Sequence, residues 1–154
     1  MHRVRELFDK IVFIADILEE NDVGNFKFPK GINEEAIKDW EKENHVSLPQ
    51  GYNNFLLLAN GFRMHGTEIY PLEQITRLDF PDEYKGYYAI GSYIGDGSMI
   101  LTDDNGNFYY GDHVDGIEKA TFEEFVERWI LDGMKEAVKE NGVNLPENLN
   151  IINS

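Results

Sequence analysis

The sequence lacks several things that common functional classes require. It has no cysteine, which excludes disulfide bonds, thiolate nucleophiles and cysteine-ligated metal centres. Basic residues are scarce, because 14 Lys and Arg stand against 29 Asp and Glu and give a formal net charge of −15. That charge disfavours binding to nucleic acid or to an anionic membrane surface, since both depend on Lys and Arg contacts to phosphate.

Long apolar runs are also missing. No window approaches the roughly 20 apolar residues of a membrane span. The apolar stretch near the N-terminus is interrupted by Asp9, Lys10 and Asp16, so it does not have the pattern of a signal peptide. We therefore expect a cytoplasmic protein.

The residues that are present predict a folded chain. Hydrophobic residues make up 42% of the 154 positions, and 10 Phe, 8 Tyr and 2 Trp make the chain too apolar for a disordered acidic tail. We expect one domain over residues 1–154, because this length suits a single hydrophobic core and no linker divides it.

The acidic excess is unevenly distributed. Residues 101–154 hold twelve acidic and four basic residues, so this last third carries a net charge of −8. Two interpretations remain open: the charge keeps the protein soluble, or it steers a cationic partner toward an acidic surface.

The first third of the sequence predicts three helices. Apolar residues recur with helical spacing over residues 3–20. Asn33 is a candidate N-cap of a second helix, because two acidic residues follow it. A third helix begins near Ser47-Leu48-Pro49, with proline at its first helical position, and ends at Asn60-Gly61.

After Gly61 the apolar spacing changes from a helical period to a period of two. The resulting pattern predicts an antiparallel meander, with Asn-Gly as its strongest turn signal. The expected strands are 67–72, 87–94, 98–103 and 108–112, with turns at 95–97 and 104–107.

A final helix follows the meander. Thr121 and Glu124 match a capping box, and Asp132-Gly133 are expected to interrupt the helix. Helices, then strands, then a helix indicate an α+β fold, with N-terminal helices and a C-terminal helix packed on an antiparallel β-meander sheet.

Catalytic and cofactor motifs are not found. The sequence has no nucleophile elbow, dinucleotide loop or phosphate-binding loop, and its histidines lack zinc-site spacing. His113 lies between Asp112 and Asp115, and the predicted hairpin would place Asp103 and Asp104 across from them. Such a group could bind a divalent cation or act in acid–base chemistry, but a solvated loop explains it more simply. We expect no enzyme activity, cofactor or metal.

Aromatic residues are dense in the predicted sheet. Alternation along the strands would place some of these residues, which include Tyr109 and Tyr110, in the core and leave others exposed, and burial of each of them in the core is the alternative. Exposed tyrosines beside carboxylates suit a protein interface, whereas single-stranded nucleic acid would need a basic groove.

One segment resembles a known family signature. Glu41, then residues 46–56 and Asn60-Gly61, are similar to the pattern Leu-Pro-x-x-Tyr-x-x-Phe-Leu followed by Asn-Gly in the SUKH superfamily. Ile90-Gly91, Gly95-Asp96-Gly97 and Phe122-x-x-Phe125 follow in the same order, so the resemblance spans roughly residues 33–131. The superfamily includes a fungal cell-wall-assembly regulator and many bacterial immunity proteins.

The resemblance implies an α+β fold without enzyme activity. It implies either an immunity protein that neutralises a toxin, often a nuclease, or a regulatory or scaffold adaptor. The signature residues are expected to be structural: Leu48, Pro49, Tyr52, Phe55, Leu56, Asn60 and Gly61. The residues expected to bind a basic toxin domain are Asp103, Asp104, Asp112, Asp115, Tyr109 and Tyr110.

Overall fold

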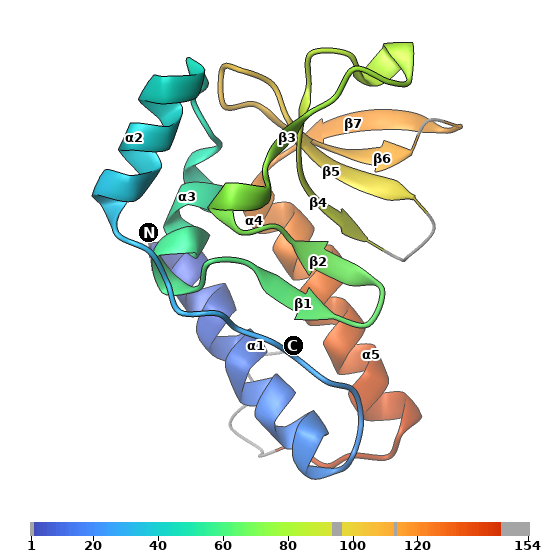
Figure 1. The fold of residues 1–154 in the computed structure, drawn as a ribbon. Coiled ribbons are helices and arrows are strands. Elements are labelled where there is room, and N and C mark those ends of the chain that lie inside the picture. The colour runs from blue at the N-terminus through green and yellow to red at the C-terminus, as the bar shows by residue number, and fades with distance from the viewer. Residues whose placement is uncertain (1, 94–96, 113, 146–154) are drawn as a thin grey trace.

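The computed structural model describes residues 2–93, 97–112 and 114–145, and within them it has an α+β fold (Figure 1). A seven-stranded antiparallel sheet lies beside a group of helices, with strand order β1-β2-β4-β5-β6-β7 and β3 paired to β4. The strands are β1 (Phe62–Met64), β2 (Thr67–Ile69), β3 (Thr76–Arg77), β4 (Tyr88–Tyr93), β5 (Ser98–Thr102), β6 (Phe108–Asp112) and β7 (Gly116–Ala120). The predicted fold class is confirmed.

The three N-terminal helices form close to their predicted positions. They are α1 (His2–Glu20), α2 (Glu34–Asn44) and α3 (Gln50–Leu58). The Asn33 side chain accepts a hydrogen bond from the Ala36 amide at 2.8 Å and caps α2 as predicted. Pro49 precedes α3 as its N-cap residue, one position earlier than predicted, with a ψ of 135° that is not helical.

The C-terminal helix differs from its prediction. Thr121 caps it through a hydrogen bond from the Glu124 amide, but Asp132-Gly133 do not interrupt it. The chain runs from α4 (Phe122–Phe125) through a π-helical turn, η3 (Val126–Leu131), directly into α5 (Asp132–Glu140). A glycine inside a helix costs only about 1 kcal/mol, which the burial of Ile130, Leu131 and Met134 outweighs.

The sheet is larger than the sequence pattern predicts. Strands β4, β5 and β6 match the predicted meander, whereas β1, β3 and β7 were not predicted. Two single-turn 3₁₀ helices, η1 (Leu72–Gln74) and η2 (Asp82–Tyr84), lie in the connection from β2 to β4. Of the predicted Gly95-Asp96-Gly97 turn, only Gly97 lies within the described residues.

The two faces of the sheet have different neighbours. The helix-facing side carries Ile69, Ile100, Phe108 and Tyr110, which join the main hydrophobic core together with α1, α3 and the C-terminal helix. The opposite side, here called the outer face, carries a smaller cluster around Tyr84, Ala89 and Leu101. None of the helices formed by the described residues is long and apolar enough to cross a membrane.

Candidate protein-binding surface

The four carboxylates predicted to bind a partner do not form one cluster. Asp103 and Asp104 lie in the turn between β5 and β6, and Asp112 and Asp115 lie in the turn between β6 and β7. These turns are at opposite ends of β6, and a strand rise of about 3.3 Å per residue separates them by roughly 16 Å. The structure therefore brings the acids together only as two separate pairs.

The Asp103 side chain is used by its own turn. Its Oδ1 accepts hydrogen bonds from the Asn105 and Asn107 amides at 2.9 and 3.0 Å, and its Oδ2 accepts from Asn107 Nδ2 and the Tyr109 hydroxyl at 2.8 and 3.1 Å. Partial burial alone would raise the pKa of the Asp103 carboxyl, but the bonds from Asn107, Asn105 and Tyr109 outweigh it, and the pKa lies below its ordinary value. Asp103 is thus a turn-forming residue.

The Asp103 turn also supports the signature segment. The Ser47 amide donates to the Asp104 carbonyl at 2.9 Å, and Ser47 forms a parallel bridge with Asn105. On the other side of this segment, Glu41 Oε2 accepts a hydrogen bond from the Leu48 amide at 2.7 Å. The start of α3 is therefore held from two sides, while the Asp104 side chain stays exposed.

The signature residues have packing and capping roles. Tyr52, Phe55 and Leu56 are at most 1% exposed, and the Tyr52 hydroxyl donates to the Tyr70 carbonyl at 2.5 Å. Burial, and to a smaller extent the charge of Glu73, raises the pKa of Tyr52 far above its ordinary value. Its hydroxyl therefore acts only as a neutral hydrogen-bond donor.

Asn60 and Gly61 shape the connection from α3 to β1. Asn60 Oδ1 accepts from the Leu72 amide at 3.0 Å, and its Nδ2 donates to Glu73 at 3.1 Å, so it holds the start of η1. Gly61 has a φ of 104°, and a Cβ there would lie 2.8 Å from the Ile69 carbonyl oxygen.

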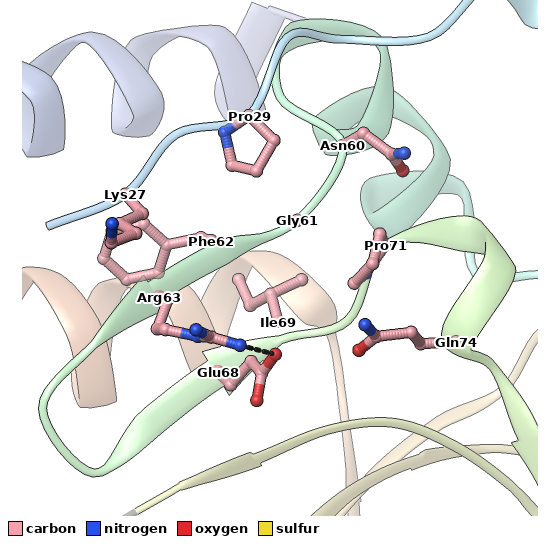
Figure 2. Close-up of a pocket in the computed structure, with 10 residues that line it drawn as sticks. All are labelled: Lys27, Pro29, Asn60, Gly61, Phe62, Arg63, Glu68, Ile69, Pro71 and Gln74. Carbon is pink, nitrogen blue, oxygen red and sulfur yellow. Dashed lines mark hydrogen bonds and ion pairs between the residues drawn. The ribbon is translucent and has the colours of Figure 1, made fainter.

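Asn60 and Gly61 also line a small pocket of about 220 Å³, shown in Figure 2. Phe62, Ile69 and Pro71 give it apolar walls, and the Arg63–Glu68 ion pair at 3.3 Å lies along one side. The Asn60 side chain is occupied by its own two hydrogen bonds, so the polar lining is mostly engaged within the fold.

The two tyrosines predicted for the interface lie on opposite faces of the sheet. Tyr110 is 8% exposed and packs on Phe125 and Trp129 in the main core, where little of it can reach a partner. Tyr109 is half-buried on the outer face, where its ring meets Tyr87 edge-on at 5.2 Å. Burial raises the pKa of Tyr109, and its hydrogen bond to the Asp103 carboxylate raises it further.

The outer face is rich in tyrosine and is only partly covered. The connection from β2 to β4 crosses it and places Tyr84 over Ala89 and Leu101. Half-buried side chains surround this cluster: Tyr70, Leu78, Tyr87, Met99, Tyr109 and Ile117. This face therefore presents apolar and phenolic atoms in contact with solvent.

Acidic residues border the outer face. Asp112 Oδ1 accepts from the Val114 and Asp115 amides at 2.8 and 2.6 Å, which leaves Val114 78% exposed at the tip of the turn. The predicted metal or acid–base residue His113 lies outside the described residues. Within the described part, no three side chains of the metal-ligating types lie close enough together to hold an ion.

A second acidic segment was missed by the sequence analysis. Residues 79–83 read Asp-Phe-Pro-Asp-Glu, and Phe80 within them is 84% exposed. The signal present in the sequence was a phenylalanine among turn-forming and acidic residues, but its exposure follows only from the fold. We define the acidic rim as Asp79, Asp82, Glu83, Asp112 and Asp115, with Phe80 and Val114 as its two exposed apolar residues.

Tyr84 links the two segments of the acidic rim. Its side chain is buried, and its hydroxyl oxygen has no hydrogen-bond partner among the residues that the structure describes. Burial raises the pKa of Tyr84, and the negative charges of Asp112 and Glu83 raise it further. The Tyr84 hydroxyl therefore stays protonated, and its burial keeps it from direct contact with a partner.

Comparisons with known proteins agree with the resemblance of the signature segment. The sequence model of the SMI1 / KNR4 family (SUKH-1) matches residues 31–141. The chain is also 36% identical over 104 residues to a Bacillus subtilis (strain 168) protein named "Uncharacterized protein YnaB", covering 62% of this chain and 70% of that protein. The match to the family model covers most of the fold, from α2 to the end of the C-terminal helix. The chain therefore belongs to the SMI1 / KNR4 family (SUKH-1).

Proposed function

We propose that this domain is a non-enzymatic, cytoplasmic immunity protein that neutralises a cognate toxin, often a nuclease, by direct binding. The observation that carries the proposal is the pair of exposed apolar residues in the acidic rim, Phe80 at 84% and Val114 at 78% exposure. Membership of a family of immunity and regulatory domains supports it.

The chemistry of the acidic rim favours a basic protein partner. Its carboxylates would attract a cationic surface and accelerate encounter. Phe80 and Val114 would then supply apolar contacts that slow dissociation, as buried anchors do in other complexes. Asp112 and Asp115 remain part of the proposed surface as sources of negative charge, although Asp112 Oδ1, like the Asp103 carboxylate, accepts hydrogen bonds within its own turn.

The test is to search the neighbouring genes for a toxin domain, to co-express that domain with this chain, and to titrate the purified proteins calorimetrically. We expect growth to be rescued, and we expect the double substitution Phe80→Ser and Val114→Ser to weaken binding by roughly 30-fold. Phe13→Ser is the matched control, because Phe13 is also an exposed apolar residue, at 44%, but lies on α1. If the double variant binds as tightly as the control, the interface lies elsewhere.

A regulatory or scaffold adaptor is the alternative function. The family takes its name from SMI1 and KNR4, and its fungal branch regulates cell-wall assembly, which is the observation that favours this alternative. Failure of the unmodified domain to protect cells from the toxin would remove the immunity role. Recovery of a stable complex with a housekeeping enzyme from the native cell would then support the adaptor.

A further inference from the structure

Two segments without acidic residues are brought together in this acidic protein. Residues 23–33 and 44–67 contain no Asp or Glu, although the chain has 29 of them. The structure joins the segments through bridges between Lys27 and Arg63 and between Lys30 and Ala59. This edge of the sheet therefore concentrates basic side chains where the rest of the molecule is acidic.

Lys27 and Arg63 form a like-charged pair. Each amide donates to the other's carbonyl, at 2.9 and 3.1 Å, so the two residues are directly opposite each other and their side chains share one face. Like charges in this position are destabilising. Arg63 pairs with Glu68 at 3.3 Å, whereas no carboxylate of the described residues pairs with Lys27 (Figure 2). A locally destabilising pair of like charges is expected where a surface has a binding role.

A groove opens next to this pair. On the N-terminal side of Lys27, the segment that follows α1 runs apart from β1 (Figure 1). A cavity of about 470 Å³ lies between them. It is lined by Gly24, Asn25, Lys27, Arg63, Met64 and His65.

An apolar pocket of about 230 Å³ adjoins the cavity and shares Gly24, Asn25, Met64 and His65 with it. Its remaining walls come from α1, the following loop and α5: Leu18, Val23, Phe26, Gly133, Met134 and Ala137. We call the two cavities together the hairpin groove, and no acidic residue lines either of them.

We propose that the hairpin groove binds an extended segment of a partner protein that carries a large apolar side chain next to acidic residues. The apolar side chain would enter the pocket between α1 and α5, and the carboxylates would lie over Lys27 and Arg63. Charge complementarity selects this occupant, because the hairpin groove is cationic at one end and uncharged at the other. The charge of the hairpin groove is opposite in sign to that of the acidic rim, and this proposal does not depend on the toxin-binding function.

The experiment is selection from a displayed library of random twelve-residue peptides against the full chain. Enriched peptides should combine net negative charge with Leu, Ile or Phe, and their affinity should fall as salt is raised. Lys27→Gln with Arg63→Gln should weaken binding about tenfold, as should Ala137→Phe, which fills the pocket. Lys38→Gln with Lys119→Gln is the control, because it removes the same charge from two other exposed positions.

Four results would overturn the proposal. The first two are that no peptides are enriched, or that basic peptides are enriched. The third is that the control pair weakens peptide binding as much as Lys27→Gln with Arg63→Gln. The fourth is that peptide binding does not change the amide chemical shifts of Gly24, Met64 and Ala137. Binding of dodecanoate without peptide binding would identify a lipid-like ligand instead. Concentration-dependent dimerisation abolished by Lys27→Gln with Arg63→Gln would identify a second copy of the chain as the occupant.

Discussion

Replacing Asp103 with asparagine tests whether this carboxylate is structural. Asparagine retains an oxygen for the Asn105 and Asn107 amides but places an amide group where Oδ2 accepts from Asn107 Nδ2 and the Tyr109 hydroxyl. Hydrogen bonds to charged groups contribute about 1.5–3 kcal/mol each, and solvent reached by these half-buried donors lowers that value. We expect Asp103→Asn to lower the free energy of unfolding by about 1–2 kcal/mol at pH 7.

The pH dependence gives this prediction a second, independent measurement. The pKa of Asp103 is lower in the folded protein than its ordinary value of 3.8, so ionisation of Asp103 stabilises the folded state. That contribution is fully present above the unfolded-state pKa and is lost as the pH falls through the folded-state value. The difference between the original protein and Asp103→Asn should therefore be constant from pH 7 to about pH 5 and shrink below about pH 4.

Urea unfolding at pH 7, 5, 4 and 3 measures both effects. Asp104→Asn is the matched control, because it makes the same chemical change at the next residue, whose side chain is exposed, whereas the side-chain hydrogen bonds of this turn are made by Asp103. The control should change stability by less than about 0.5 kcal/mol. Equal effects of the two substitutions, or a difference that persists undiminished at pH 3, would refute the structural role of Asp103.

Three further predictions concern the core, the glycines and the acidic rim. Tyr52→Phe should lower the free energy of unfolding by about 1–2 kcal/mol in denaturant titration, because the half-buried Tyr70 carbonyl loses its donor. Gly133→Ala should raise the free energy of unfolding by about 0.5–1 kcal/mol, since that position is helical and has open space around it. Gly31→Ala should lower the free energy of unfolding by more than about 2 kcal/mol, because the new Cβ would lie 2.1 Å from the Leu57 carbonyl oxygen. Phe80→Ser should leave the melting temperature within about 2 °C while it weakens toxin binding.

The predicted elements were accurate where a local physical signal was strong. Asn33 and Thr121 cap helices because their oxygens reach amides three residues away, an interaction that depends only on neighbouring residues. β6 matches its predicted bounds because a turn precedes it and its apolar residues alternate. The strands that were missed lack such a pattern, since β7 is an exposed edge and β1 has only three residues.

The candidate site was predicted less well than the fold because its geometry depends on tertiary structure. Asp103 and Asp112 are both acidic residues next to β6, but they lie at its opposite ends, and the length of the strand keeps them from sharing a site. Tyr109 and Tyr110 were considered together, but adjacent strand residues face opposite sides of a sheet. Phe80 was not identified because its exposure results from a loop that crosses the outer face.

The π-helical turn of the C-terminal helix determines which way that helix faces. In a regular α-helix, residues four apart are offset by about 40°, so four such steps from Phe122 would turn Val138 about 160° away. Yet Phe122, Val126, Ile130, Met134 and Val138 are all buried. The wider turn at Val126–Leu131 winds more slowly and brings these residues back into phase. Deleting one residue there would leave a continuous helix whose two halves point their apolar sides in different directions.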